Sequence, residues 1–226
     1  MKRGKLIVLE AGDASGKATQ AERLLQHLAE DGFLARKIEF PNYQSDSSAL
    51  IQMYLRGDFG GKADQVNPYV ASTFYTVDRF ASYRMEWEEF YTSGGIVIAD
   101  RYTTSNMLHQ AVKMSDRLLR EQYLRWLEHF EFDLFGLPRP DCVLFLDLPP
   151  QYSARLLAQR RWQANEKSVP DIHEQDLAYL ARCYASAQEV IAQYGWRRIP
   201  CIRDEQLRSI EEIHADIYQV VKAVLA

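Results

Sequence analysis

The fold is decided near the start of the chain, by Leu6-Ile7-Val8-Leu9-Glu10-Ala11-Gly12-Asp13-Ala14-Ser15-Gly16-Lys17-Ala18-Thr19-Gln20. An apolar run is followed by a loop of small residues and then by helical spacing over Lys17–Asp31. Small residues let consecutive backbone N–H groups turn toward a polyphosphate, a helix N-terminus favours negative charge, and a lysine neutralises phosphate oxygens. Gly12, Gly16 and Lys17 supply these parts. The run therefore predicts a strand, a phosphate-binding loop and a helix.

The loop departs from the P-loop pattern G-x-x-x-x-G-K-[ST] at two positions. Ala11 replaces the first glycine, and Ala18 replaces the hydroxyl residue that usually binds Mg²⁺. Taken alone, the loop is also open to a second interpretation, a strand, turn and helix with a solvated lysine. Adenylate kinases are similar here, with a small residue after the lysine and then Thr-Gln, so the departure does not by itself disable the loop. The expected ATP-binding residues are Gly12, Asp13, Ala14, Ser15, Gly16, Lys17, Ala18 and Thr19.

Short apolar runs alternate with longer stretches of helical spacing, which is typical of βαβ units around a buried parallel sheet. The expected strands are Leu6–Glu10, Ala35–Phe40, Ile96–Asp100, Cys142–Asp147 and Arg198–Cys201. The expected helices are Lys17–Asp31, Ser47–Leu55, Pro68–Thr92, Thr104–Lys113, Asp116–Phe130, Tyr152–Gln163, Glu174–Tyr194 and Ile210–Leu225. This order predicts an α/β fold of the P-loop NTPase type, a doubly wound five-stranded parallel sheet with helices on both faces. At 226 residues we expect a single domain over 1–226, in which the polar segment Trp162–Ile172 lies within a helical lid at about 160–173.

Composition excludes several other classes of protein. A formal net charge of -4 argues against binding of nucleic acid polymers or anionic membranes through bulk electrostatics. The three cysteines, Cys142, Cys183 and Cys201, lie far apart and indicate neither a zinc site nor a disulfide framework. The apolar run Leu6–Leu9 is too short for a signal sequence or a membrane span. We therefore expect a soluble cytoplasmic protein with reduced cysteines.

A second motif, Asp100-Arg101-Tyr102, follows the apolar strand 96–100. In a parallel sheet the ends of such strands share the edge that carries the phosphate loop. An acid at that edge can hold Mg²⁺ through water, and an arginine can donate two N–H bonds to a monophosphate. A surface ion pair at the end of a strand is the alternative interpretation.

Several further motifs occur in a specific order. They are Leu9-Glu10 leading into Asp13 and Gly16-Lys17, Phe40-Pro41, Phe74-Tyr75-Thr76-Val77-Asp78-Arg79, Asp100-Arg101-Tyr102, Leu137-Pro138-Arg139-Pro140-Asp141 before Leu144-Phe145-Leu146-Asp147, and Asp171-Ile172-His173-Glu174. In this order and spacing the sequence resembles the thymidylate kinase family over nearly its whole length.

The resemblance implies transfer of the γ-phosphoryl group of Mg-ATP to dTMP, giving dTDP and ADP, by a homodimer with Mg²⁺ as cofactor. It implies that Arg101 clamps the dTMP phosphate, that Asp100 works near Mg²⁺ as the metal residue, and that Asp13 faces the acceptor sugar. The implied catalytic residues are Lys17, Asp100, Arg101 and Arg160. The implied substrate-binding residues are Asp13, Phe40, Tyr75, Arg79, Arg101, Ser105 and Gln110.

Tyr75 and Arg79 are four residues apart and share one face of a helix, where a ring can stack on thymine and a guanidinium can reach a carbonyl edge. An ordinary pair on a helix surface has the same spacing. Two positions depart from the family pattern. His109 stands where an aromatic ring is more usual, and Tyr43 stands where many members have an arginine for the acceptor phosphate. That phosphate therefore depends more on Arg101.

Basic residues at Arg155, Arg160, Arg161 and Lys167 enter the expected lid, where they can stabilise charge on the phosphoryl group in transfer. A solvated basic helix face is the alternative. Two rival functions remain open from the sequence. One is a kinase for another deoxynucleotide or a deoxynucleoside, and the other, suggested by Ala11 and Ala18, is a nucleotide-binding regulator with impaired catalysis.

Overall fold

The computed structural model describes residues 3–12, 14–164, 172–173 and 176–226, and the side chains of residues 158–164 lie outside this description. Its centre is a five-stranded sheet in the order β2-β3-β1-β4-β5, in which every neighbouring pair is parallel. The strands are β1 Lys5–Ala11, β2 Ala35–Glu39, β3 Ile96–Asp100, β4 Cys142–Asp147 and β5 Arg197–Pro200. The predicted α/β fold and parallel sheet are confirmed.

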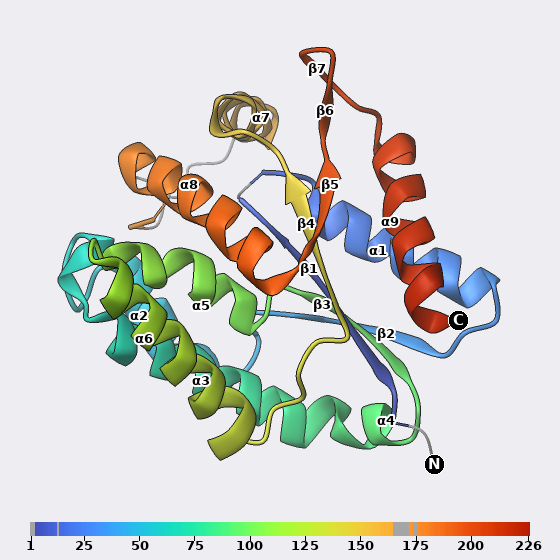
Figure 1. Cartoon of the computed structure of the whole chain (residues 1–226), viewed down its shortest axis with the longest axis horizontal. Coiled ribbons are helices and arrows are strands. Elements are labelled where there is room, and N and C mark those ends of the chain that lie inside the picture. Colours follow the sequence, from blue (N-terminus) through green and yellow to red (C-terminus); the bar gives the residue numbers. More distant parts are fainter. Residues whose placement is uncertain (1–2, 13, 165–171, 174–175) are drawn as a thin grey trace.

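Helices cover both faces of the sheet (Figure 1). They are α1 Lys17–Glu30, α2 Ala49–Arg56, α3 Pro68–Ser82, α4 Glu88–Thr92, α5 Thr103–His109, α6 Arg117–Glu128, α7 Pro150–Ala164, α8 Leu177–Tyr194 and α9 Ile210–Leu225. Shorter turns join them: 3-10 turns at Asp46–Ser48, Ala63–Gln65 and Ala111–Lys113, and π-turns at Tyr83–Trp87 and His129–Leu134. The single helix predicted over Pro68–Thr92 is therefore α3, a π-turn and α4 in succession.

Alternation along β1 divides the core into two layers. Ile7 and Leu9 pack with α1 and α9 on one face, whereas Leu6 and Val8 pack toward α5, α6 and α8 on the other. All four side chains are fully buried. Burial of each such side chain contributes about 1.5–3 kcal/mol relative to exposure. The strand that leads into the phosphate loop is thus held rigidly from both sides.

The register of the sheet places the ends of three strands together. Leu9 of β1 lies opposite Asp100 of β3, and Ala11 lies opposite Leu146 of β4. Because β1 sits between these two strands, the loop that follows it opens at the switch point of the sheet, where ligands bind in open α/β folds. Both predicted motifs, the loop before Lys17 and the Asp100 motif, therefore meet at one edge.

Two features of the C-terminal part were not predicted. Strands β6 (Ile202–Arg203) and β7 (Gln206–Leu207) form a small antiparallel hairpin after β5. Helix α9 begins with a capping box, in which Ser209 and Glu212 bond each other's backbone N–H groups.

Among the described residues, no helix combines the length and apolar composition needed to cross a bilayer.

Candidate active site at the carboxyl edge of the sheet

The loop between β1 and α1 has the backbone that a phosphate cradle needs. Gly16 caps α1 in the left-handed region, with φ of 80°. Ala14 also has a positive φ, of 55°, which is uncommon for a residue with a Cβ and marks a constrained position. Ser15 Oγ is buried and has no hydrogen-bond partner among the described residues. Asp13 lies outside the described residues, so its predicted contacts to ATP and the acceptor sugar stay predictions.

Lys17 and Asp100 meet across this edge. Lys17 Nζ lies 2.6 Å from Asp100 Oδ1, and the two side chains are 12% and 9% exposed. Burial, followed by the nearby charge of Arg101, lowers the pKa of Lys17, while Asp100 and Glu10 oppose that shift. Additional negative charge, such as that of a triphosphate, would favour the protonated lysine.

Arg101 is held in a constrained backbone conformation. Its φ is 68°, and its backbone N–H donates to the Leu9 carbonyl at 3.1 Å. Its Nη1 lies 3.2 Å from Glu10 Oε1 and 3.3 Å from the Ala11 carbonyl. A positive φ at a residue with a long side chain costs on the order of 1–3 kcal/mol and persists where the surroundings enforce it. The surroundings here aim the guanidinium across the end of β1.

Glu10 provides much of this constraint and was not predicted as a site residue. It is fully buried, and besides Arg101 it accepts bonds from Thr104 Oγ1 and Ser105 Oγ, each at 2.8 Å. The backbone N–H of Ala11 donates to it as well. The sequence did hold a signal, because an acid inside an otherwise apolar strand is buried only when it is paired.

Beside Arg101 lies a cavity of about 230 Å³ between α2, α3 and α5. It is lined by Pro41, Tyr43, Leu55, Tyr75, Arg101, Ser105, Asn106, His109, Gln110 and His173. We call it the acceptor cavity. The structure thus brings together four of the predicted substrate residues, namely Tyr75, Arg101, Ser105 and Gln110.

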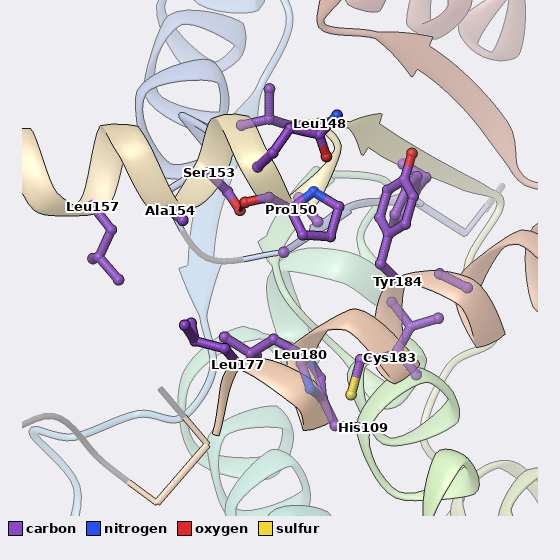
Figure 2. A pocket seen from close by; sticks show the side chains of 16 residues that line it. His109, Leu148, Pro150, Ser153, Ala154, Leu157, Leu177, Leu180, Cys183 and Tyr184 are labelled. Carbon is purple, nitrogen blue, oxygen red and sulfur yellow. Dashed lines mark hydrogen bonds between the residues drawn. The ribbon is translucent and has the colours of Figure 1, made fainter. Parts of the chain in front are cut away.

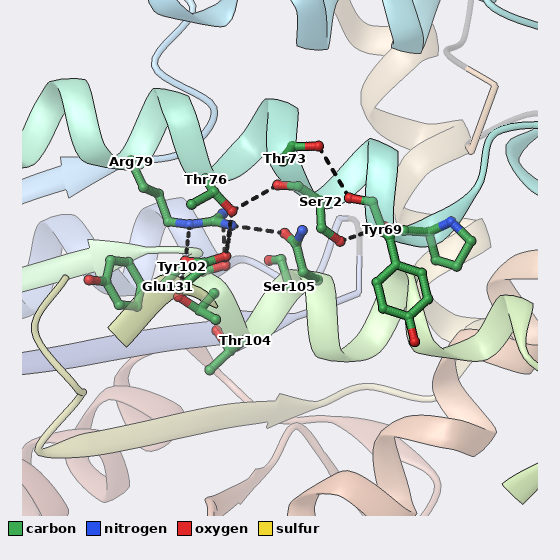
Figure 3. A network of polar contacts seen from close by, with 12 residues as sticks. Tyr69, Ser72, Thr73, Thr76, Arg79, Tyr102, Thr104, Ser105 and Glu131 are labelled. Atoms are coloured by element: carbon green, nitrogen blue, oxygen red, sulfur yellow. Dashed lines mark hydrogen bonds and ion pairs between the residues drawn. The ribbon is translucent and has the colours of Figure 1, made fainter. Parts of the chain in front are cut away.

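Arg79 and Phe40 are not among the residues that line the acceptor cavity, so their expected direct contacts with the substrate stay predictions. Arg79 is 1% exposed and pairs with Glu131, its Nε lying 2.8 Å from Glu131 Oε2 (Figure 3). Thr76 and Thr103 also donate to Glu131. The spacing of Tyr75 and Arg79 along α3 does not reveal this ion pair, because Glu131 lies 52 residues further along the chain.

Phe40 is 5% exposed and packs in the core near Tyr102, with ring centroids 6.0 Å apart. Strand β2 ends just before Phe40. From the segment that follows, Pro41 and Tyr43 line the cavity. Burial of a large ring next to the sheet is more favourable than its exposure at the mouth of a polar cavity.

Asn106 was missed in the sequence, and Arg79 fixes its orientation. Arg79 Nη2 donates to Asn106 Oδ1 at 3.3 Å, and because a guanidinium can only donate, the oxygen of this amide must face it. Asn106 Nδ2 is then left with no partner among the described residues, and so is Gln110 Oε1. Both residues line the acceptor cavity. Two residues that line the cavity therefore carry one unmatched buried donor and one unmatched buried acceptor.

A second cavity, of about 270 Å³, lies between α7 and α8 (Figure 2). Gly12 of the loop is among the residues that line it. Leu148, Leu157, Leu177 and Leu180 dominate its wall. Among the described residues that line it none carries a formal charge, so it does not match phosphate groups.

Arg160 belongs to α7 but its side chain lies outside the described residues, as does most of the expected lid at 160–173.

Mg²⁺ prefers oxygen ligands, and the described residues near the loop supply few of them. Asp100 supplies carboxylate oxygens at the mouth of the loop, whereas Ala18 presents a methyl group. The described residues contain no group of three or more His, Cys, Asp or Glu that could hold a metal by themselves. These residues fit a cation that is held mainly by nucleotide oxygens and water.

A phosphate loop at the switch point of a parallel sheet, with an arginine-lined cavity beside it, defines a P-loop kinase-like protein. A family model for thymidylate kinase matches residues 9–217. The chain belongs to the thymidylate kinase family.

Individual relatives agree with this assignment. The thymidylate kinase of Schizosaccharomyces pombe is 27% identical over 222 residues, which cover 98% of this chain and 93% of the relative. That of Caenorhabditis elegans is 33% identical over 163 residues, 68% of this chain and 67% of the relative. A solved thymidylate kinase structure from Candida albicans has the same fold, with a TM-score of 0.68 and 20% identity over 98% of this chain and 92% of that one.

Proposed function

We propose that this protein transfers the γ-phosphoryl group of Mg-ATP to dTMP, giving dTDP and ADP. The family membership supports a phosphotransferase, and the observation that carries the choice of acceptor is the polar pair Asn106 Nδ2 and Gln110 Oε1 at the wall of the acceptor cavity. The alternative is a kinase for another deoxynucleotide or a deoxynucleoside. Another base would make different hydrogen bonds with this pair, and an unphosphorylated nucleoside would have no phosphate for Arg101 to bind.

The unmatched donor and acceptor are complementary to the edge of thymine. Thymine presents an acceptor at C4 and an N–H donor at N3, which match Asn106 Nδ2 and Gln110 Oε1 respectively. An unpaired buried polar group costs about 1–3 kcal/mol, which a base with the matching groups recovers. Cytosine has an acceptor at N3 and an amino donor at C4, so it mismatches both. Tyr75 lies in the same cavity and offers a ring for stacking.

The charged residues divide between the two substrates. Arg101 borders the acceptor cavity, where its guanidinium can bind the monophosphate, and Lys17 stands at the start of α1, where it can bind the β and γ phosphates. Phosphoryl transfer needs no covalent intermediate, so these residues act by position and charge. Mg²⁺ would be held by ATP oxygens, water and Asp100, and would neutralise charge on the phosphates. Arg160 is proposed to add positive charge from the lid.

A homodimer is part of the proposal. On α3, Val70, Val77 and Phe80 are 48%, 44% and 38% exposed and fall on one face of the helix. Leu50 on the adjacent α2 is 44% exposed. An apolar face of this kind is suited to burial against a second copy. Light scattering tests the proposal: the native chain should have twice the mass of the chain with Val77→Glu, and two equal masses would contradict it.

An ADP-release assay over a panel of nucleoside monophosphates tests the acceptor. We expect dTMP to be preferred, dUMP to be weaker by about 1–3 kcal/mol because it lacks a methyl group, and purines to be poor in so small a cavity. We expect dCMP to be at least about a hundredfold weaker because two buried polar groups stay unmatched. Preference for AMP, dCMP or unphosphorylated thymidine would contradict the proposal.

The rival regulator is favoured by a single observation, the two alanines in the loop. It predicts nucleotide binding without turnover for every acceptor in the same panel. Binding of ATP by calorimetry alongside the assay separates this outcome from a misfolded preparation.

A further inference from the structure

Part of the acceptor cavity is lined by the segment that follows β2. Pro41 and Tyr43 of this segment are among the lining residues, and Asn42 lies between them in the chain. The segment is neither helix nor strand until the 3-10 turn at Asp46–Ser48. Its position therefore depends on its contacts with neighbouring elements.

Asp78 on α3 makes two of these contacts. Its Oδ2 accepts a hydrogen bond from the Asn42 backbone N–H at 2.8 Å, and its Oδ1 accepts one from Ser47 Oγ at 2.6 Å. The Pro41 carbonyl accepts from the Tyr43 N–H at 3.0 Å. Both polar groups of the peptide between Pro41 and Asn42 are thus engaged, and its N–H is held by Asp78. One side chain of α3 fixes the segment at two points.

Burial of this carboxylate has a cost. Asp78 is 1% exposed, and its two donors, an amide and a hydroxyl, are both neutral. Among the described residues no cationic side chain forms an ion pair with it, and Arg79, the next residue, pairs with Glu131. An acid is rarely buried without such a pair, because its charge loses the solvation that water provides. Real proteins bear such costs mainly at functional sites.

A second acid contacts the same segment at the surface. Glu86 Oε1 accepts from Asn42 Nδ2 at 2.9 Å, and its Oε2 accepts from Ser82 Oγ at 2.7 Å. Glu86 is exposed, so water can replace its bond to the Asn42 side chain at little cost. Of these two acids, it is Asp78 that binds the backbone of the segment, and the backbone sets the place of Tyr43.

We propose that Asp78 is a positioning residue for the acceptor: by holding the peptide between Pro41 and Asn42 against α3, it keeps Tyr43 in the wall of the acceptor cavity. Tyr43 shares this cavity with Arg101, and a phenol hydroxyl can add one hydrogen bond to those of the guanidinium. Tyr75 lines the cavity from the same helix as Asp78, so α3 sets the relative positions of two aromatic side chains. The proposal rests on the proposed function in so far as the cavity receives a nucleoside monophosphate. Asp78 itself is assigned no contact with the substrate.

Hydrogen exchange tests the hold on the segment without any enzyme assay. Exchange over residues 41–47 is followed by mass spectrometry in the full-length native protein, in Asp78→Ala and in Asp78→Asn. We expect exchange to be about tenfold faster in Asp78→Ala, because the Asn42 N–H loses its acceptor. Asp78→Asn should stay within about threefold of the native rate, since an amide can accept from Asn42 and donate to the Ser47 hydroxyl. Equal exchange in the native protein and Asp78→Ala overturns the proposal.

Calorimetry with each nucleotide separately tests the consequence for the acceptor. We expect Asp78→Ala to weaken dTMP binding about tenfold and to leave ATP binding within about twofold, and Asp78→Asn to recover most of the affinity for dTMP. The matched control is Asp116→Ala. Asp116 also accepts a backbone N–H, from Leu119 at 3.0 Å, but as the exposed cap of α6. Its loss should lower stability, as loss of a helix cap does, and should change neither affinity.

A double-mutant cycle connects Asp78 with Tyr43. Tyr43→Ala removes the side chain that Asp78 is proposed to position, so it should weaken dTMP binding by itself. Asp78→Ala should then cost little further affinity for dTMP once Tyr43 is replaced, because both changes remove the same contribution. Losses that add in the double variant overturn the proposal, since Asp78 would then act on the acceptor by another route. An unchanged affinity in Tyr43→Ala overturns it as well.

A purely structural role gives a different pattern. Equal weakening of ATP and dTMP binding in Asp78→Ala overturns the proposal, as does an equal loss of dTMP affinity in Asp116→Ala. If Asp78→Ala does not fold, Ser47→Ala replaces it, since this variant removes only the hydroxyl at Oδ1. We expect it to weaken dTMP binding about threefold, and an unchanged affinity overturns the proposal. A native protein that does not bind dTMP contradicts the proposed function instead, and the exchange rates still decide whether Asp78 holds the segment.

Discussion

The two halves of the site are built in different ways. The donor half is a loop of small residues whose backbone turns toward the ligand, and its Gly12, Gly16 and Ala18 are exposed. The acceptor half is a set of side chains held by buried partners: Glu10 behind Arg101, and Arg79 with Glu131 behind Asn106. In the donor half the described charge is the single pair Lys17–Asp100, whereas in the acceptor half several buried side chains hold one another in a network. Substitutions should therefore have different consequences in the two halves.

The largest effect is expected in the buried network of the acceptor half. Glu131→Gln leaves the Arg79 guanidinium buried without its anion, and loss of one partner of a buried pair costs about 3–5 kcal/mol. The matched control is Glu121→Gln, which breaks a surface pair with Arg117, 87% exposed, and should cost about 1 kcal/mol or less. Urea unfolding measures both. Equal losses in the two variants would mean that the network behind Asn106 is not what stabilises this half.

This network also marks the limit of what the sequence could predict. The strands β3 and β4 begin and end where they were predicted, because buried parallel strands leave runs of apolar, β-branched residues. The hairpin β6–β7 is too short to leave such a run. The face shared by Tyr75 and Arg79 was predicted from spacing within one helix, but Glu131, the buried partner of Arg79, is distant in sequence. Periodicity describes local structure and cannot identify such pairs.

In the site too, some residues could be placed from the sequence and others could not. The loop and the Asp100-Arg101 motif were placed at one edge because parallel strands end together, and the structure brings Lys17 and Asp100 within 2.6 Å. Asn106 was missed because its role depends on the orientation of an amide, which only its partner Arg79 fixes. Roles that depend on strand order could be predicted, and roles that depend on side-chain partners could not.

The next effect tests the division of labour between the two halves. Arg101→Ala should weaken dTMP binding by about 1.5–3 kcal/mol, the value of a hydrogen bond to a charged group, and should leave ATP binding nearly unchanged. Calorimetry with each nucleotide separately measures this difference. Arg117→Ala removes an exposed arginine and should change neither affinity. Equal weakening for ATP and dTMP would show that Arg101 maintains the whole edge of the sheet, and the contrast between the halves would fail at this residue.

The smallest effect concerns the donor half and Ala18, which lies in the first turn of α1 and is exposed. A hydroxyl after the P-loop lysine is the usual Mg²⁺ ligand, and the methyl group of Ala18 cannot replace it. Ala18→Ser adds one oxygen with little bulk, so we expect tighter apparent Mg²⁺ binding and a rate gain of roughly tenfold, or about 1.4 kcal/mol in the barrier. Titration of activity against Mg²⁺ for both proteins measures it.

Thr19→Val is the control for this experiment, because it removes the neighbouring hydroxyl while keeping the shape of the side chain. If Ala18→Ser changes nothing and Thr19→Val weakens Mg²⁺ use, the ligand position is already filled by Thr19, and the donor half holds its metal through a hydroxyl side chain. If both variants match the native protein, water and ATP oxygens complete the coordination. In that case the two halves would differ most, because the donor half would hold its metal with no hydroxyl side chain from the start of α1.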